Sequence, residues 1–380
     1  MKKLLIALCG LALVAGCSKP GNSGENNNGS SSENKVIETP AFAKGADVSW
    51  LSEMEANGKT FKKKDGTTAD CFDVLKDCGV NSIRLRVWVN PTGGWSAKED
   101  MVKLAVRAAK AGMAVMVDFH YSDFFCDPSR QTLPKDWEAD KSDVTKIAAH
   151  VTDHTTEVLQ ALKAAGVTPA WIQIGNETRN GFLWPVGKLW ATGGETVGGK
   201  EGFNTLYKAG YSAAKAVFPS ALVGPHLPNA YSDNDWWFKD RKDSGCKFDM
   251  ICLSHYPQAE SKMTPAEYNS AAITSIRNLH SSYNVPVIVS EIGVKTPDGE
   301  AAAASVLSEF MTALKALPAS TCTGVFYWEP EVYDWWKPSV YGNADAIYQY
   351  TGKRETWNSY NMGAFLTGGR PSKVMDALCQ

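Results

Sequence analysis

The chain carries almost no excess of charge of either sign. Its 380 residues include 39 lysines and arginines and 41 aspartates and glutamates, which gives a formal net charge of −2. Proteins that bind nucleic acid usually show a clear positive excess, because contacts with the phosphate backbone dominate that affinity. We therefore predict that this chain binds neither nucleic acid nor another strongly anionic polymer.

The sequence also lacks closely paired cysteines. No two of them have the C-x-x-C spacing of a zinc or redox site, and nine cysteines less Cys9 and Cys17 near the amino terminus leave seven. Cys71 and Cys78 fall on one expected helix and lie ~10 Å apart along its axis, which is too far for a disulfide. The sequence predicts mostly buried, free thiols and no zinc site.

The apolar run at the amino terminus is too short to cross a bilayer as a mature helix. It follows Lys2 and Lys3 and ends in the sequence VAGC at Cys17, which resembles a bacterial lipobox. We predict a lipoprotein signal peptide at residues 1–16 and lipid attachment at Cys17. An ordinary secretory signal cleaved nearby is the alternative.

The residues after Cys17 are polar and rich in Gly, Ser and Asn, so they cannot bury enough apolar surface to fold. We interpret residues 17–40 as a flexible polar tether. The protein is then expected to be a membrane-anchored bacterial lipoprotein, at the outer membrane and cell surface, although the sequence leaves the membrane face open.

From residue 42 onward, short apolar runs alternate with amphipathic stretches. The 144–165 stretch, for example, places its apolar residues on one helical stripe. The runs expected to be strands are Ala43–Val48, Ser82–Val89, Ala114–Phe119, Ala170–Ile174, Ala221–Gly224, Asp249–Leu253, Val285–Val289 and Gly324–Tyr327.

Eight such alternations predict an α/β fold, the (β/α)8 TIM barrel, as a single catalytic domain over residues 41–380. A doubly wound open sheet is the alternative. It usually carries a glycine-rich phosphate loop after a strand, and the sequence contains none.

Every expected strand ends in polar or aromatic residues, and three of the six histidines lie at these ends. In a TIM barrel the carboxyl ends of the strands form the active site. Glu177 ends the fourth strand and Glu291 ends the seventh, after an almost wholly apolar run. A glutamate beside a buried run is costly unless it has partners or a function.

Two glutamates at opposite sides of one barrel mouth fit glycoside hydrolysis, which needs two carboxyl groups flanking one bond. One must stay protonated and the other ionised. Arg84 and Arg86 share one face of the second strand, so at least one can hold Glu291 ionised, and Tyr256 can donate to the same carboxylate.

Several motifs together resemble glycoside hydrolase family 53 of clan A, the endo-β-1,4-galactanases. The resemblance spans residues 42–379, and its most specific motifs are RLRVWVNP (84–91) and DFHYSD (118–123). The other motifs are GADVSWLSEME (45–55), IGNETRNGFLWPVG (174–187), SHYP (254–257) and FYWEP (326–330).

The resemblance implies a retaining enzyme that cuts β-1,4-galactan polysaccharide and oligosaccharides, with Glu177 as the acid/base and Glu291 as the nucleophile. It implies no cofactor, and we expect a monomer. The residues that it places along the substrate groove are Asp47, Arg86, Trp88, His120, Asn176, His226, Asn229, Tyr256 and Trp328. Asn176 is expected to bind the sugar 2-hydroxyl and Trp328 to stack under a sugar.

The chain departs from the family pattern after the nucleophile. Some bacterial members carry a calcium-binding run there, whereas residues 294–300 read VKTPDGE. Calcium takes six to eight oxygen ligands, and this run offers too few, so we predict no calcium at this loop and name no metal ligands elsewhere.

Two other functions remain open at this stage. One is a different clan A endo-β-glycanase, such as a mannanase or xylanase, which the two specific motifs disfavour. The other is a surface lipoprotein that binds glycan without cutting it. Such a protein would not need both Glu177 and Glu291, so their joint presence favours an enzyme.

Overall fold

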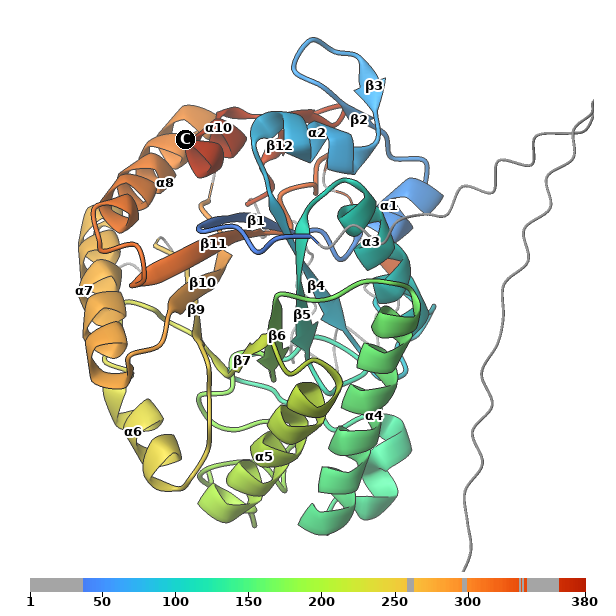
Figure 1. Ribbon diagram of the computed structural model, residues 1–380, viewed down its shortest axis with the longest axis vertical. Coiled ribbons are helices and arrows are strands. Elements are labelled where there is room, and N and C mark those ends of the chain that lie inside the picture. The colour runs from blue at the N-terminus through green and yellow to red at the C-terminus, as the bar shows by residue number, and fades with distance from the viewer. Residues whose placement is uncertain (1–36, 258–262, 296–298, 335, 337, 340–361) are drawn as a thin grey trace, which may run out of the picture. The chain divides into compact units, whose positions relative to one another are not determined.

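Parallel strands form the central sheet of the molecule (Figure 1). They are β1 (Ala43–Asp47), β4 (Ser82–Val87), β5 (Ala114–Phe119), β6 (Trp171–Ile174), β7 (Leu222–Gly224), β8 (His226–Leu227), β9 (Ile251–His255), β10 (Val287–Ile292) and β11 (Cys322–Trp328). Their order is β7-β6-β5-β4-β1-β11-β10-β9-β8. Only Pro225 separates β7 from β8, so the two ends of this order belong to one passage of the chain. The sheet therefore closes into an eight-passage barrel.

Helices follow the strands and cover the outside of the barrel (Figure 1). They are α2 (Cys71–Cys78), α3 (Lys98–Lys110), α4 (Val144–Ala164), α5 (Gly199–Val217), α6 (Asp235–Asp243), α7 (Pro265–Tyr283), α8 (Glu300–Lys315) and α10 (Lys373–Cys379). The predicted TIM barrel is thus confirmed, and closure of the sheet rules out the doubly wound alternative.

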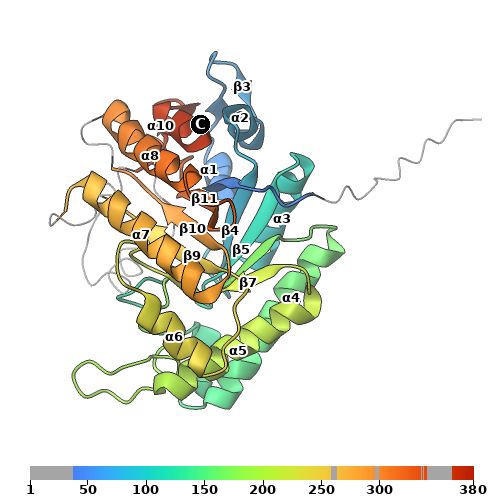
Figure 2. The same cartoon turned by 60° about the vertical axis from the view of Figure 1, so that its left-hand side comes forward.

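Smaller elements decorate the connections. They are helix α1 (Leu51–Ala56), the 3-10 helix η1 (Lys135–Asp140), and the short antiparallel pairs β2 (Phe61–Lys62) with β3 (Thr68–Ala69) and β12 (Phe365–Leu366) with β13 (Arg370–Pro371). Figure 2 shows α4 and α5 side by side along the lower edge of the barrel.

Local signals in the sequence fix where several helices begin and end. Asp70 caps α2 by accepting from the backbone N–H of Phe72, and Gly79 ends it in the left-handed conformation. Thr264 and Glu267 form a reciprocal capping box at the start of α7. These caps set the lengths of helices that would otherwise run on into the loops.

The barrel interior is layered. At the amino ends of the strands, apolar side chains fill it, with Trp171 and Phe326 in edge-to-face contact at 5.7 Å. Gly45 makes room for this plug, because a Cβ there would lie 2.1 Å from the Phe326 ring. Two residues beyond Trp171, the same face of β6 carries Gln173, and polar groups take over toward the carboxyl ends. The apolar layer is the floor beneath the polar site.

The computed structural model describes residues 37–380 apart from 258–262, 296–298, 335, 337 and 340–361. Among these residues, no helix combines the length and the apolar character needed to cross a bilayer. All seven cysteines of the barrel are free and five are buried, which confirms the prediction from spacing. Cys17 and the predicted signal peptide and tether, except residues 37–40, lie outside the described residues.

Candidate active site

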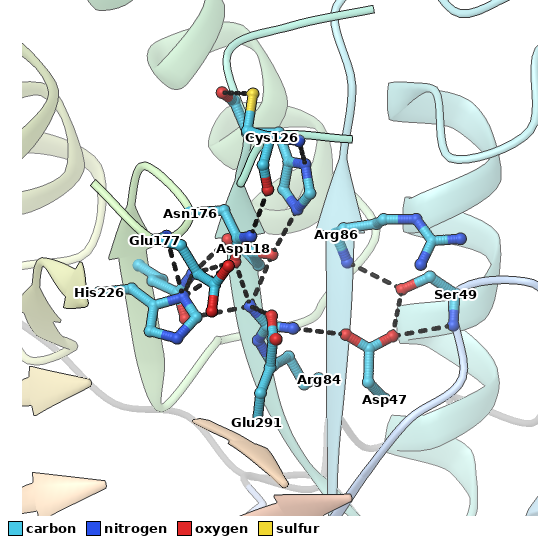
Figure 3. A network of polar contacts seen from close by, with 12 residues as sticks. Asp47, Ser49, Arg84, Arg86, Asp118, Cys126, Asn176, Glu177, His226 and Glu291 are labelled. Carbon is cyan, nitrogen blue, oxygen red and sulfur yellow. Dashed lines mark hydrogen bonds and ion pairs between the residues drawn. The ribbon is translucent and has the colours of Figure 1, made fainter. Parts of the chain in front are cut away.

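One buried arginine organises the polar layer at the carboxyl ends of the strands (Figure 3). Arg84 on β4 is 1% exposed, and its Nη1 donates to Asp47 at 2.7 Å. Its Nη2 lies 2.8 Å from Asp118, 2.9 Å from the Asn176 side-chain oxygen and 2.9 Å from Glu291. A planar guanidinium can hold several acceptors in fixed directions at once. Arg84 thus ties four strand ends to one cation.

Glu291 lies on β10 and is 5% exposed. Besides the ion pair with Arg84, it accepts a hydrogen bond from the Tyr256 hydroxyl at 2.8 Å and one from Ser254 at 3.4 Å. Both expectations for this carboxylate, an arginine partner from the second strand and a tyrosine donor, are confirmed. Its oxygens are fixed in position before any substrate binds.

Glu177 stands just beyond β6 and faces Glu291 across the mouth (Figure 3). Its φ of 50° is left-handed, which is uncommon for a residue other than glycine. The turn is fixed by Gly175, where a Cβ would lie 2.4 Å from the Thr178 methyl group. Ligand atoms of Glu177, Glu291 and the His226 ring lie within 4.8 Å of one another. The turn therefore brings the two carboxyl groups close together.

The surroundings give the two carboxyl groups different proton affinities. Burial, followed by the charge of Glu291, raises the pKa of Glu177 well above its ordinary value. Burial also raises the pKa of Glu291, but Arg84 and the Tyr256 hydroxyl oppose that rise. Of the two, Glu177 therefore holds its proton more tightly, and Glu291 beside Arg84 ionises more readily.

A cavity of about 250 Å³ opens onto the two glutamates. Six of the nine predicted groove residues line it, namely Asp47, Arg86, His120, Asn176, Tyr256 and Trp328. Sequence reasoning missed three consecutive lining residues, Phe125, Cys126 and Asp127. They lie in the loop after β5, and only the DFHYSD motif just before them pointed to this region.

The other three predicted groove residues do not line this cavity. Trp88 is 1% exposed and donates through Nε1 to His120 at 3.2 Å, so it supports the cavity wall from behind. His226 is fully buried beneath Asn176 and Glu177. Asn229 is half-buried and does not line this cavity. The structure thus places these three outside the cavity lining, and a role for them in binding substrate stays a prediction.

The Asn176 amide is already engaged. Its Nδ2 donates to the Cys126 carbonyl at 2.8 Å, and its oxygen accepts from Arg84. One N–H of the amide remains for a ligand in the cavity. Asn176 therefore also ties the loop after β5 to the acid-bearing turn.

A second ion pair stands beside the first. Arg86 donates to Glu329 at 2.7 Å, and its guanidinium lies 4.0 Å from the Trp50 ring centroid. Burial raises the pKa of Glu329 to about 8, against the opposing charge of Arg86. This pair holds Arg86 at the cavity edge.

The cluster of Glu177, His226 and Glu291 has the residue types of a metal site, but the contacts of these residues argue against a bound metal ion. Both ring nitrogens of His226 have partners, Asn176 at 2.8 Å and Ser254 at 2.8 Å. Arg84 already supplies a positive charge 2.9 Å from Glu291, which disfavours a second cation there. The residues present therefore do not fit a resident metal.

A closed parallel barrel with two facing glutamates at the ends of its fourth and seventh passages defines the chain as a glycoside hydrolase. Residues 43–365 match the model of glycosyl hydrolase family 53. The chain therefore belongs to glycosyl hydrolase family 53, as its motifs suggested.

Relatives agree with this assignment. The probable arabinogalactan endo-β-1,4-galactanase A of Aspergillus fumigatus is 34% identical over 313 residues, covering 76% of this chain and 83% of that protein. The arabinogalactan endo-β-1,4-galactanase of Thermothelomyces thermophilus is 30% identical over 312 residues, covering 76% and 89%. Among solved structures, the family 53 catalytic domain of Ignisphaera aggregans superposes with a TM-score of 0.73 at 27% identity, covering 90% of this chain and 97% of that one.

Proposed function

We propose that the protein is a retaining endo-hydrolase of β-1,4-galactosidic bonds, acting on the galactan and type I arabinogalactan side chains of pectin. The observation that carries the proposal is the approach of Glu177 and Glu291 to within 4.8 Å in a family 53 barrel. Retaining enzymes hold their two carboxyl groups ~5–5.5 Å apart, whereas inverting enzymes leave room for a water at ~6.5–9.5 Å. Relatives named as arabinogalactan endo-β-1,4-galactanases support the substrate.

In the first step, a carboxylate oxygen of Glu291 attacks the anomeric carbon of a galactosyl residue. The bond from that carbon to the glycosidic oxygen breaks, and Glu177 gives its proton to the departing oxygen. The product is a galactosyl ester of Glu291, and Glu177 is left as a carboxylate. Burial of Glu177 prepares this transfer, because its raised pKa keeps the carboxyl group protonated until the substrate is bound.

In the second step, the Glu177 carboxylate takes a proton from a water molecule that attacks the same carbon. The ester bond breaks, Glu291 leaves as an anion, and Glu177 regains its proton. Two displacements at one carbon restore the original configuration. Arg84 and Tyr256 stabilise the anion that leaves, at 2.9 and 2.8 Å.

Purified residues 40–380 are expected to release reducing sugar from potato-type galactan and not from mannan or xylan. The products should be oligosaccharides of mixed length from the start of the reaction, because an endo-enzyme cuts within the chain. Parallel digests followed by reducing-end assays and chromatography make the measurement. Release from mannan or xylan but not from galactan would instead support another clan A glycanase.

We also propose that the protein is a monomer anchored to the bacterial outer membrane through a lipid on Cys17. Support comes from the basic start, the short apolar run and the VAGC sequence, followed by a polar stretch with few apolar side chains to bury. A lipid anchor would hold the barrel near the surface where polysaccharide arrives, with the stretch to residue 40 as a spacer.

Cells fed a radiolabelled fatty acid should incorporate label into the wild-type protein, and Cys17→Ser should incorporate none. The label should accompany the outer-membrane fraction, and protease added to intact cells should remove a surface-exposed barrel. An unlabelled wild-type protein whose mature amino terminus is not at Cys17 would favour the ordinary secretory signal.

A further inference from the structure

Two exposed tryptophans stand together outside the catalytic cavity. Trp190 is 42% exposed and Trp236 is 44% exposed, and they are the large apolar side chains that the described residues leave open to solvent. Their ring centroids lie 6.0 Å apart, with the ring planes tilted by 47°. We call this pair the tryptophan platform. Two large rings exposed side by side are costly unless something covers them.

The platform is built from two different connections of the barrel. Trp190 lies in the segment between β6 and α5, and its backbone N–H donates to the Asn180 side chain at 3.3 Å. Trp236 is the second residue of α6, and its neighbour Trp237 is 1% exposed. The two neighbouring side chains therefore point apart, with Trp237 packed inward and Trp236 outward.

Arg179 connects the platform to the catalytic acid. It is two residues beyond Glu177, and its guanidinium carbon lies 5.7 Å from the Trp236 ring centroid. Its carbonyl accepts from the buried Trp237 Nε1 at 3.1 Å, so a hydrogen bond links the acid-bearing turn to the start of α6. The platform is therefore on the rim next to Glu177.

This position assigns the platform to one end of the substrate. Glu177 protonates the oxygen of the departing sugar, so the departing part of the chain lies on the Glu177 side of the cavity. Trp328, which lines the cavity, ends β11, four barrel passages away from β6. The tryptophan platform and Trp328 thus stand on opposite sides of the cleavage point.

We propose that Trp190 and Trp236 form a binding subsite for the leaving-group part of the galactan chain, beyond the first departing sugar. The inference rests on the proposed function. One face of a β-galactopyranosyl ring carries mainly C–H groups, because its axial 4-hydroxyl is on the other face. Such a face packs on an indole ring, and Arg179 beside the platform can donate to the sugar hydroxyls. Since this binding is retained in the transition state, it increases kcat/KM for long chains.

Paired substrates test the assignment. Galactan occupies both sides of the cleavage point, whereas nitrophenyl β-1,4-galactobioside has a leaving group with no sugar in it. Trp190→Ala and Trp236→Ala should each lower kcat/KM on galactan by about tenfold, the equivalent of about 1.4 kcal/mol. Neither should change kcat/KM on the nitrophenyl substrate by more than about twofold, because exposed substitutions leave the fold nearly unaffected.

Trp190→Phe and Trp236→Phe are the matched controls, since each keeps an aromatic face, and they should retain most of the activity on galactan. Equal losses on both substrates, or no loss on galactan, would overturn the assignment. So would a wild-type dimer, measured by light scattering, that both alanine variants dissociate, because a second copy would then cover the rings. If the wild-type protein cleaves neither substrate, the proposed function itself fails and the subsite falls with it.

Discussion

Glu291→Ala should abolish turnover of galactan while leaving the barrel folded. The loss of activity should reach roughly 10⁴-fold or more, because the variant lacks the group that forms the covalent intermediate. The fold should survive, since Arg84 keeps Asp47 at 2.7 Å and Asp118 at 2.8 Å as partners for its charge. Reducing-sugar release and circular dichroism, measured on the same preparation, check the two halves of this expectation.

Glu177→Ala is the informative comparison for Glu291→Ala. It removes the proton donor but leaves the nucleophile, so it should still cleave substrates whose leaving groups need no proton, in the first step only. Azide should restore turnover in Glu291→Ala by attacking from the vacated side, giving a product of inverted configuration. A Glu291→Ala variant with full activity would remove the nucleophile assignment.

The barrel could be predicted from sequence because its strands are buried on both faces. Such strands appear as apolar runs bounded by polar ends, and all eight predicted runs overlap strands of the sheet. Helix α6 gives a much weaker signal in the sequence, for the converse reason. Its sequence, DWWFKDRKD, is short and mostly charged, and it buries only a few side chains. Periodicity cannot reveal a helix that has so narrow an apolar face.

The two facing glutamates could also be predicted, since each comes within three residues of the end of an apolar run and the strand order fixes which ends face each other. Trp88 shows where that reasoning stops. By strand alternation it should point to the same side as Arg84 and Arg86. However, β4 ends at Val87, and the backbone N–H of Trp88 donates to the Ser96 carbonyl at 2.8 Å. Past the end of a strand, alternation no longer determines which way a side chain points.

Contacts between distant loops were beyond the reach of sequence patterns. The loop after β5 brings Phe125 and Cys126 over the cavity, where the Cys126 carbonyl accepts from Asn176. This contact between Cys126 and Asn176 cannot be predicted from hydrophobic periodicity or motif spacing. It depends on how the loop after β5 packs against the turn after β6. His226 is likewise a strand-end residue by sequence, yet the turn at Glu177 covers it.

Arg84→Met should be the most damaging single change to the stability of the barrel. The side chain has a similar length but no charge, so Asp47, Asp118 and Glu291 would share a buried site without the cation that holds them. Removing one partner of a buried ion pair typically costs ~3–5 kcal/mol in the free energy of unfolding. Ser49 still donates to Asp47, and His120 lies 2.9 Å from Asp118, which limits the damage. The midpoint of urea unfolding measures the change.

Arg84→Lys separates the charge from the geometry. A lysine keeps the positive charge but has one nitrogen where Arg84 uses two, so it cannot reach Asp47 and Asp118 together in the same directions. We expect it to recover most of the stability and little of the activity, because Glu291 would lose its fixed orientation. The acidic limb of its pH–rate profile should also move to higher pH. In the wild type, Arg84 opposes the rise in the Glu291 pKa that burial causes. A lysine opposes it less well, so the pKa of Glu291 rises and the nucleophile becomes protonated at a higher pH. A lysine variant with wild-type activity and an unshifted acidic limb would show that Arg84 serves stability alone.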